Sequence, residues 1–175
     1  MLNCILAVIT AAAVLVADQL TKAYIVANFT HNFSKSFIPY LIDLTFIYNG
    51  GGAWGMLSGH TWILLTITAI IMLACIIMLI KLGTKNKLLF WAVCLVLGGG
   101  IGNMIDRIFR DGLVVDFLQF AFWKSFPVFN VADIAIVIGA GLLILYFVIS
   151  SADEMKDSRK IKSSMPSEEN DAENL

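Results

Sequence analysis

The chain has 175 residues, of which 59% are hydrophobic and 14% are charged, with a net charge of −1 and a mean hydropathy of +0.84. This composition excludes an ordinary soluble domain and is typical of an integral membrane protein. The small net charge and the lack of a basic stripe also argue against a nucleic-acid partner.

Four apolar segments are long enough to cross a bilayer, which takes about 20 residues of helix. They cover residues 2–26, 62–82, 88–105 and 132–150. The first segment could be mistaken for a cleavable signal peptide, but it begins without Lys or Arg and runs on past Asp18. We therefore expect it to be retained as a span.

The three cysteines, Cys4, Cys75 and Cys94, all lie inside these segments and form no CxxC pattern. Neither a disulfide framework nor a metal site is expected from them, and no cofactor is expected. The two histidines, His31 and His60, lack HExxH spacing, so a zinc protease is not expected either.

Basic residues between the segments predict an orientation. Seven of the twelve lie at or beyond the end of the second segment, or beyond the fourth: Lys81, Lys85, Lys87, Lys156, Arg159, Lys160 and Lys162. Because positively charged loops remain in the cytoplasm, we expect both termini there and residues 27–61 and 106–131 outside. A membrane domain is expected over residues 1–150, followed by a polar, disordered cytoplasmic tail over 151–175.

This orientation brings polar residues from distant segments to one level. At about 1.5 Å per residue, Asp18 and the pair Asn103 and Asp106 lie roughly 22–27 Å above the cytoplasmic edge. Asp133 opens the fourth span from outside, and Asp116 precedes it. The full set expected at the outer interface is Asp18, Lys22, Asn103, Asp106, Arg107, Asp116, Asn130 and Asp133. Ionisable groups at the edge of hydrocarbon are costly, which makes them functional candidates.

Asp116 and Asp133 are the leading candidates in this set. Two carboxyls that share one proton form the working unit of an aspartic protease. Between them lies an aromatic segment with Phe117, Phe120, Phe122, Trp123 and Phe126. This segment is typical of an interfacial aromatic belt, and a short interfacial helix there would form a lip over the site.

Two local patterns predict packing and pairing inside the membrane. Gly98 and Gly102 form a small-xxx-small pair, which permits close helix crossing in lipid. Asp18 and Lys22 are four residues apart on one helix face and can form an ion pair.

The outer loop contains a further pattern. Residues 37–57 alternate apolar and polar types before a run of glycines at 50–52. This predicts short strands and a flexible rim that could hydrogen-bond an extended substrate backbone.

Five motifs resemble, in order, those of the bacterial lipoprotein signal peptidase family (signal peptidase II). They are Asp18-Gln19-Leu20-Thr21-Lys22, Asn49-x-Gly51-x-Ala53-Trp54, Gly102-Asn103-Met104-Ile105-Asp106-Arg107, Val114-Val115-Asp116-Phe117 and Phe126-Pro127-x-Phe129-Asn130-x-Ala132-Asp133. The resemblance covers residues 1–150. It departs from the family at Trp54, where Phe is common.

The resemblance implies that Asp116 and Asp133 are the catalytic aspartates. It implies dyad-supporting or substrate-contacting roles for Asp18, Lys22, Asn49, Gly51, Ala53, Asn103, Arg107 and Asn130. The implied fold is an all-α membrane protein with four transmembrane helices, a small extracytoplasmic β-rich loop and the short interfacial helix. We expect a monomer, although no pattern in the sequence determines the oligomeric state.

The activity implied by the resemblance is removal of the signal peptide from diacylglyceryl-modified prolipoproteins, just before the lipidated cysteine. The partners would be these precursors and membrane lipids, at the outer face of the bacterial inner membrane. One aspartate would stay protonated and polarise the scissile carbonyl, while the other activates a water. The sequence does not assign the proton to either residue.

A non-enzymatic alternative is a membrane scaffold or small transporter subunit that uses these charges as structural ion pairs. A transporter should place polar groups near mid-membrane and often shows repeated halves. Neither feature is visible in the sequence, which favours the peptidase.

Overall fold

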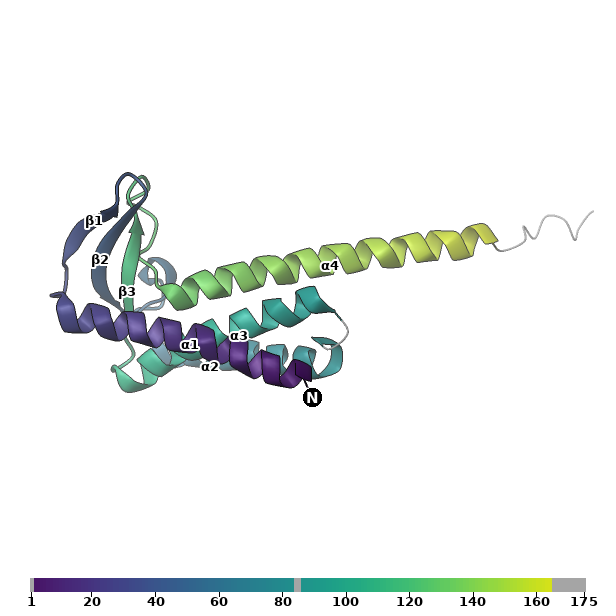
Figure 1. Cartoon of the computed structure of the whole chain (residues 1–175), viewed down its shortest axis with the longest axis horizontal. Coiled ribbons are helices and arrows are strands. Elements are labelled where there is room, and N and C mark those ends of the chain that lie inside the picture. The colour runs from purple at the N-terminus through teal and green to yellow at the C-terminus, as the bar shows by residue number, and fades with distance from the viewer. Residues whose placement is uncertain (1, 84–85, 165–175) are drawn as a thin grey trace, which may run out of the picture. The chain divides into compact units, whose positions relative to one another are not determined.

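The computed structural model describes residues 2–83 and 86–164 (Figure 1). Its four long helices are α1 (Leu2–Asn28), α2 (Thr61–Met78), α3 (Lys87–Phe109) and α4 (Val131–Ser164), and the π-helical turn η2 (Leu79–Gly83) follows α2. Each long helix carries an apolar stretch of sufficient length to span a membrane. The four expected spans are therefore confirmed.

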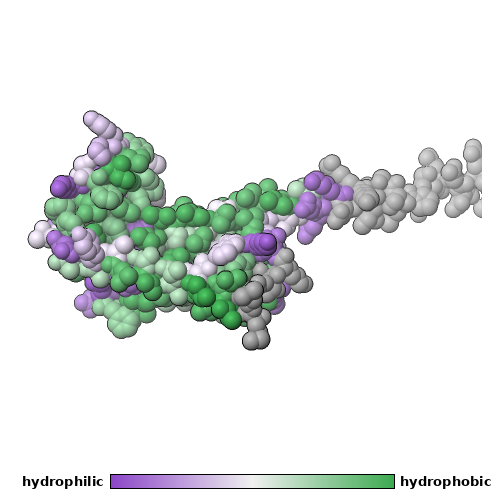
Figure 2. Space-filling model, in the orientation of Figure 1, coloured by the Kyte–Doolittle hydropathy of each residue, from purple (hydrophilic) through white to green (hydrophobic). Residues whose placement is uncertain are grey.

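Apolar side chains cover the outside of these helices, as Figure 2 shows in green. On α2, for example, Ile70 is 63% exposed and Leu73 is 59% exposed. A surface of this kind is stable in hydrocarbon rather than in water, because it offers lipid tails no unsatisfied polar groups.

A three-stranded antiparallel sheet supplies the rest of the architecture. Its strands are β1 (Ser34–Ile38), β2 (Ile42–Asn49) and β3 (Val114–Phe120), in the order β1-β2-β3. β1 and β2 confirm the short strands expected in the first outer loop. Figure 1 shows the strands at one end of α1, α2 and α3, running across the helix axes.

The short interfacial helix is not found where it was expected, between Asp116 and Asp133. Residues 114–120 form β3, and turns lead from there to Asn130. The β-branched and aromatic residues of this segment suit a strand once β2 is available as a partner. A single 3-10 turn, η1 (Ala53–Gly55), lies instead in the loop after β2.

Glycines allow α1 and α3 to approach closely. A Cβ atom on Gly98 would lie 2.8 Å from the carbonyl oxygen of Ala11, and one on Gly102 would lie 2.5 Å from the carboxyl of Asp18. The small-xxx-small prediction is thus confirmed. Its consequence for the site is that the Asp18 carboxyl reaches the backbone of α3.

A second contact joins the sheet to α1. Ile25 of α1 packs with Phe46 of β2 and with Val115 and Phe117 of β3 in one buried cluster. This apolar cluster packs one face of β3 against α1. Because successive side chains of a strand point to opposite faces, the side chain of Asp116, between Val115 and Phe117, points away from α1.

The chain divides into two compact units, one up to residue 143 and the other from residue 144 onward. α4 continues to Ser164, beyond the end at Ser150 expected from the sequence and into the segment expected to be disordered. Residues 151–164 contain Ala, Glu, Met, Lys and Arg without Gly or Pro, which favours helix. The remainder of that tail, 165–175, lies outside the described residues, and the domain boundary at residue 150 stays a prediction.

Candidate active site

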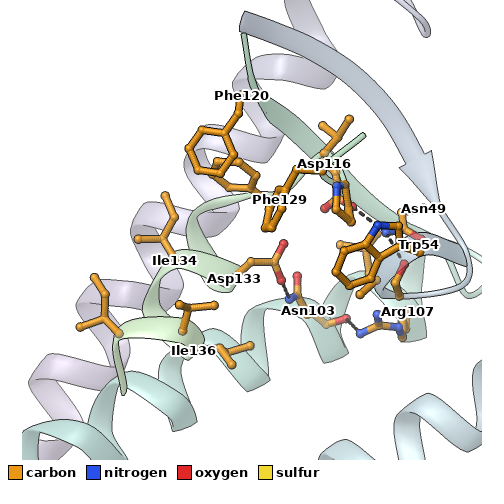
Figure 3. Close-up of a pocket in the computed structure, with 18 residues that line it drawn as sticks. Asn49, Trp54, Asn103, Arg107, Asp116, Phe120, Phe129, Asp133, Ile134 and Ile136 are labelled. Atoms are coloured by element: carbon orange, nitrogen blue, oxygen red, sulfur yellow. Dashed lines mark hydrogen bonds between the residues drawn. The ribbon is translucent and has the colours of Figure 1, made fainter. Parts of the chain in front are cut away.

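Asp116 and Asp133 line the same cavity, which has a volume of about 370 Å³. β3 supplies Asp116, and the first turn of α4 supplies Asp133. Figure 3 shows both carboxyls turned into this space, with Trp54 across from them. The lining also includes Asn49, Gly52, Ala53, Asn103, Arg107, Phe120, Phe126, Phe129, Ile134 and Val137. The two acids therefore lie in a largely apolar pocket with few polar neighbours.

Asp133 is held by the cap of its own helix. The backbone N–H of Asn130 donates to Asp133 Oδ2 at 3.1 Å, and the backbone N–H of Asp133 donates to Asn130 Oδ1 at 2.9 Å. This reciprocal arrangement is a capping box, with Asn and Asp in place of the usual Ser and Glu. It restricts the rotamer of Asp133 before any tertiary contact is made.

Asp116 accepts two amide hydrogen bonds, from Asn130 Nδ2 at 2.7 Å and from Asn49 Nδ2 at 2.8 Å. Burial, together with the nearby negative charge of Asp133, raises the pKa of Asp116 to about 7. The two amide donors act in the opposite direction, because they stabilise the carboxylate. Asp116 can therefore carry a proton near neutral pH.

Asn103 contacts Asp133 directly and reaches Asp116 through Asn130. Its Nδ2 donates to Asp133 Oδ1 at 2.7 Å, and its Oδ1 accepts from Asn130 Nδ2 at 3.1 Å. The same Oδ1 also accepts from Lys22 Nζ at 2.9 Å. Because two donors face this oxygen, the amide of Asn103 is oriented with its NH2 group toward Asp133.

Beneath Asn103 lies a buried ion cluster. Lys22 Nζ is 2.9 Å from Asp18 Oδ2 and 3.1 Å from Asp106 Oδ2, and all three side chains are fully buried. With Asn103, these contacts use the three donors of the ammonium group. The ion pair expected between Asp18 and Lys22 is present, and Asp106 completes it.

The same ion cluster also hydrogen-bonds to the backbone of α4 and β3, the two elements that carry Asp133 and Asp116. Asp18 Oδ1 accepts the backbone N–H of Ala132 at 3.0 Å, next to Asp133. Asp106 Oδ2 accepts the backbone N–H of Val115 at 3.1 Å, next to Asp116. The charged residues of α1 and α3 thus set the separation of β3 and α4.

The glycine-rich loop after β2 forms the rim of the cavity. Asn49 Oδ1 accepts the backbone N–H of Gly51 at 2.9 Å. A Cβ atom on Gly51 would lie 2.6 Å from the carbonyl oxygen of Gly55, so only glycine fits this tight loop. Ala53 lines the cavity.

Arg107 lines the cavity as well, and its Nη1 donates to the backbone oxygen of Asn103 at 3.3 Å. Its Nε is buried and has no hydrogen-bond partner among the residues that the structure describes. A buried guanidinium nitrogen left unsatisfied beside two acids is unusual in a folded protein, which marks Arg107 as a candidate site residue.

One contributor was missed as a site residue in the sequence analysis. Gln19 Nε2 donates to Asp18 Oδ2 at 3.1 Å and to Asp106 Oδ1 at 3.2 Å, and so ties the two acids of the ion cluster together. Gln19 lies in the first motif, between Asp18 and Lys22, and this position could have identified it as a site residue from the sequence.

Residues 10–149 match the family model described as Signal peptidase (SPase) II. The chain belongs to this family. The lipoprotein signal peptidase of Brevibacillus brevis is 43% identical over 135 residues, which cover 77% of this chain and 89% of the relative. That of Bacillus pumilus is 40% identical over 148 residues, covering 84% and 90%.

A solved structure described as a bacterial membrane enzyme agrees with signal peptidase II membership. It matches with a TM-score of 0.77 and 33% identity, and the match covers 84% of this chain and 90% of the solved one. Signal peptidase II is a family of membrane peptidases, so the chain is an enzyme. The scaffold or transporter alternative is not favoured.

Proposed function

We propose that this signal peptidase II removes the signal peptide from diacylglyceryl-modified prolipoproteins, on the N-terminal side of the lipidated cysteine, with Asp116 and Asp133 as its catalytic pair. Family membership supports the activity. One observation carries the assignment of the pair: both carboxyls line one cavity, and Asn130 hydrogen-bonds to both.

The proposed reaction begins with a water held between the two acids. The Asp133 carboxylate accepts a proton from this water, whose oxygen attacks the scissile carbonyl carbon. Asp116, with its pKa raised to about 7, donates its proton to the carbonyl oxygen and so produces a gem-diol. Return of a proton to the amide nitrogen allows the C–N bond to break, and the new carboxyl group leaves with the signal peptide.

The other proposed site residues act around this pair. Asn49, Asn103 and Asn130 orient the carboxyls through the hydrogen bonds described above. Asp18 and Lys22 act through Asn103 and through the backbone of α4. Gly51 and Ala53 shape the rim, and Arg107, whose side chain lines the cavity, binds a substrate carbonyl. Phe120, Phe129 and Val137 offer apolar contacts to the lipidated precursor.

We also propose a topology in which the active site faces the outer side of the bacterial inner membrane and both termini lie in the cytoplasm. The basic residues after the second and fourth spans support this orientation. A cysteine in place of the exposed Ser58 should react with an impermeant reagent added outside intact spheroplasts. Reaction only after the inner face is opened would reverse the topology. The enzyme is proposed to act as a monomer.

The decisive experiment measures cleavage of a diacylglyceryl-modified precursor by purified variants reconstituted in vesicles. Asp116→Asn and Asp133→Asn should each remove most activity, and the double variant should be little worse than either, because the two groups act as a unit. Asp111→Asn is the matched control, since Asp111 is an exposed acid outside the cavity. Substantial turnover by either single dyad variant, at normal membrane abundance, would refute the pair.

A further inference from the structure

The end of β1 and the turn that follows it expose several large apolar side chains close together in the sequence. Tyr40 is 92% exposed, Phe37 is 64% exposed and Leu41 is 49% exposed. Two aromatic residues of the loop after β3, Phe122 at 65% and Trp123 at 51%, are equally open. A shallow pocket joins the two groups, since Tyr40 and Phe122 both line it. We call these five residues the hairpin tip.

Backbone hydrogen bonds hold the hairpin tip in a defined conformation. The backbone N–H of Leu41 donates to the oxygen of Ile38 at 3.0 Å, and Ala121 donates to Leu41 at 3.0 Å. Tyr40 adopts a φ of 64°, a conformation that residues with a bulky side chain rarely take. The fold therefore holds a large aromatic group outward at some conformational cost, although a glycine would fit this turn without strain.

The direction of the strands indicates what the tip meets. The strands lie at one end of α1, α2 and α3 and run across the helix axes (Figure 1). Because those helices cross the bilayer, the strands run along its surface. The tip at their end therefore extends parallel to the membrane plane instead of along its normal.

The tip is also continuous with the lipid-facing surface of the spans. The ring of Phe122 lies 5.2 Å from that of Phe120, which lies 5.2 Å from that of Phe126. Phe120 and Phe126 line the cavity together with Val137 of α4, which is 70% exposed. An unbroken apolar path thus leads from the tip to a membrane-spanning helix.

We propose that the hairpin tip inserts into the interfacial layer of the membrane and binds phospholipid. Aromatic side chains with nearby Lys residues are the usual composition of such elements, and Lys35 and Lys124 adjoin the tip. Lys124 pairs with Asp43 of β2, which links the loop after β3 to the hairpin. Insertion anchors β2 and β3 at a constant height, and with them Asn49 and Asp116.

Site-specific fluorescence tests this insertion without reference to any enzymatic activity. The full chain carries Cys4→Ala and Tyr40→Cys and is labelled with a nitrobenzoxadiazole dye, while the buried Cys75 and Cys94 remain. The protein is reconstituted in vesicles of phosphatidylethanolamine and phosphatidylglycerol. A matched control carries the dye at Asp111→Cys, in another exposed loop.

The expected result is strong quenching of the dye at position 40 by lipids with a nitroxide near the headgroup, and weak quenching by iodide. The dye at position 111 should show the reverse order. Equal quenching of both dyes by iodide would overturn the proposal. Protection of position 40 from both quenchers would also overturn it, because that result indicates a protein contact.

A kinetic experiment tests the consequence and rests on the proposed function. Phe37→Ser with Tyr40→Ser should raise KM for a vesicle-embedded lipidated precursor by about fivefold and leave kcat unchanged. Phe37→Trp with Tyr40→Trp should retain the parent KM. A fall in kcat with constant KM would contradict the proposal that the hairpin tip anchors the sheet to the membrane. If no precursor is cleaved by any variant, the proposed function fails while the fluorescence result still decides the insertion.

Discussion

Asn130 and Asp133 exchange hydrogen bonds across the first turn of α4, at 2.9 Å and 3.1 Å. The same Asn130 side chain donates to Asp116 at 2.7 Å. One residue therefore caps the N-terminal end of a membrane-spanning helix and also orients both acids of the proposed dyad. A substitution of Asn130 therefore affects both the stability of the helix and the geometry of the site. A control variant that removes a helix cap elsewhere is needed to separate these two effects.

Asn130→Ala should lower the stability of the protein by about 1–3 kcal/mol, since it removes a helix cap and leaves buried acceptors unsatisfied. Cleavage should fall by about 100-fold or more, because both acids lose a positioning contact. Asn86→Ala is the matched control: Asn86 caps α3 through bonds to Leu88 and Leu89, away from the cavity. It should cost stability but retain the turnover of the folded enzyme. Equal losses of turnover in the two variants would contradict the role of Asn130.

Lys22→Met should destabilise the protein by about 3–5 kcal/mol, because it removes the ammonium group that pairs with two buried acids. Asp18 then lacks this counter-charge, and Asp106 keeps the longer contact to Arg110 Nε at 3.4 Å. Adding Asp18→Asn should recover part of this loss, since it removes the uncompensated charge of Asp18. Unfolding of the purified variants in mixed detergent micelles measures both effects. A double variant at least as unstable as Lys22→Met would show that the cluster is not held by charge compensation.

The pH dependence of cleavage should follow Asp116. If its protonated form donates to the scissile carbonyl, kcat/KM falls as pH rises through about 7, the pKa of this carboxyl. The amide of Asn49 lowers this pKa by binding the carboxylate. Asn49→Ala should therefore move the alkaline limb to higher pH. The exposed Asn28 donates to the backbone oxygen of Tyr24 in its own helix and does not line the cavity, so Asn28→Ala should leave the limb unchanged.

A shift of the limb to lower pH in Asn49→Ala would reverse the assigned effect of the hydrogen bond. An alkaline limb unchanged in both variants would indicate that a group other than Asp116 limits the reaction at high pH.

Gly99→Ala should lower both stability and activity. A Cβ atom there would collide with the carbonyl oxygen of Ala132 and lie 2.9 Å from Ile136, which would displace the first turn of α4 and Asp133 with it. Overpacking of this kind costs about 1–3 kcal/mol. Gly141→Ala is the matched control, since a Cβ at Gly141 meets nothing within 4 Å. It should be neutral or stabilise α4 slightly. The same loss in both variants would point to helix flexibility instead of close packing.

Several features of this protein were predictable from one-dimensional signals. Hydropathy located the four spans, because about 20 apolar residues are required whatever their neighbours are. The rise of a helix then placed Asp18, Asn103 and Asp106 at one level. Sequence spacing also indicated the Asp18–Lys22 pair and the close crossing at Gly98 and Gly102, since both depend on positions along a single helix.

Other features depended on contacts between distant parts of the chain. The segment after Val114 was expected to contain an interfacial helix, but β3 forms there because β2, about 70 residues earlier, offers a partner strand. The bond of Asn130 to Asp116, and the bond of Asp106 to the backbone of Val115, likewise join elements that no local pattern connects. Strand pairing and hydrogen-bond partners are decided by three-dimensional proximity. Composition and periodicity could therefore place these polar groups at one depth in the membrane, but only tertiary packing decided which of them touch.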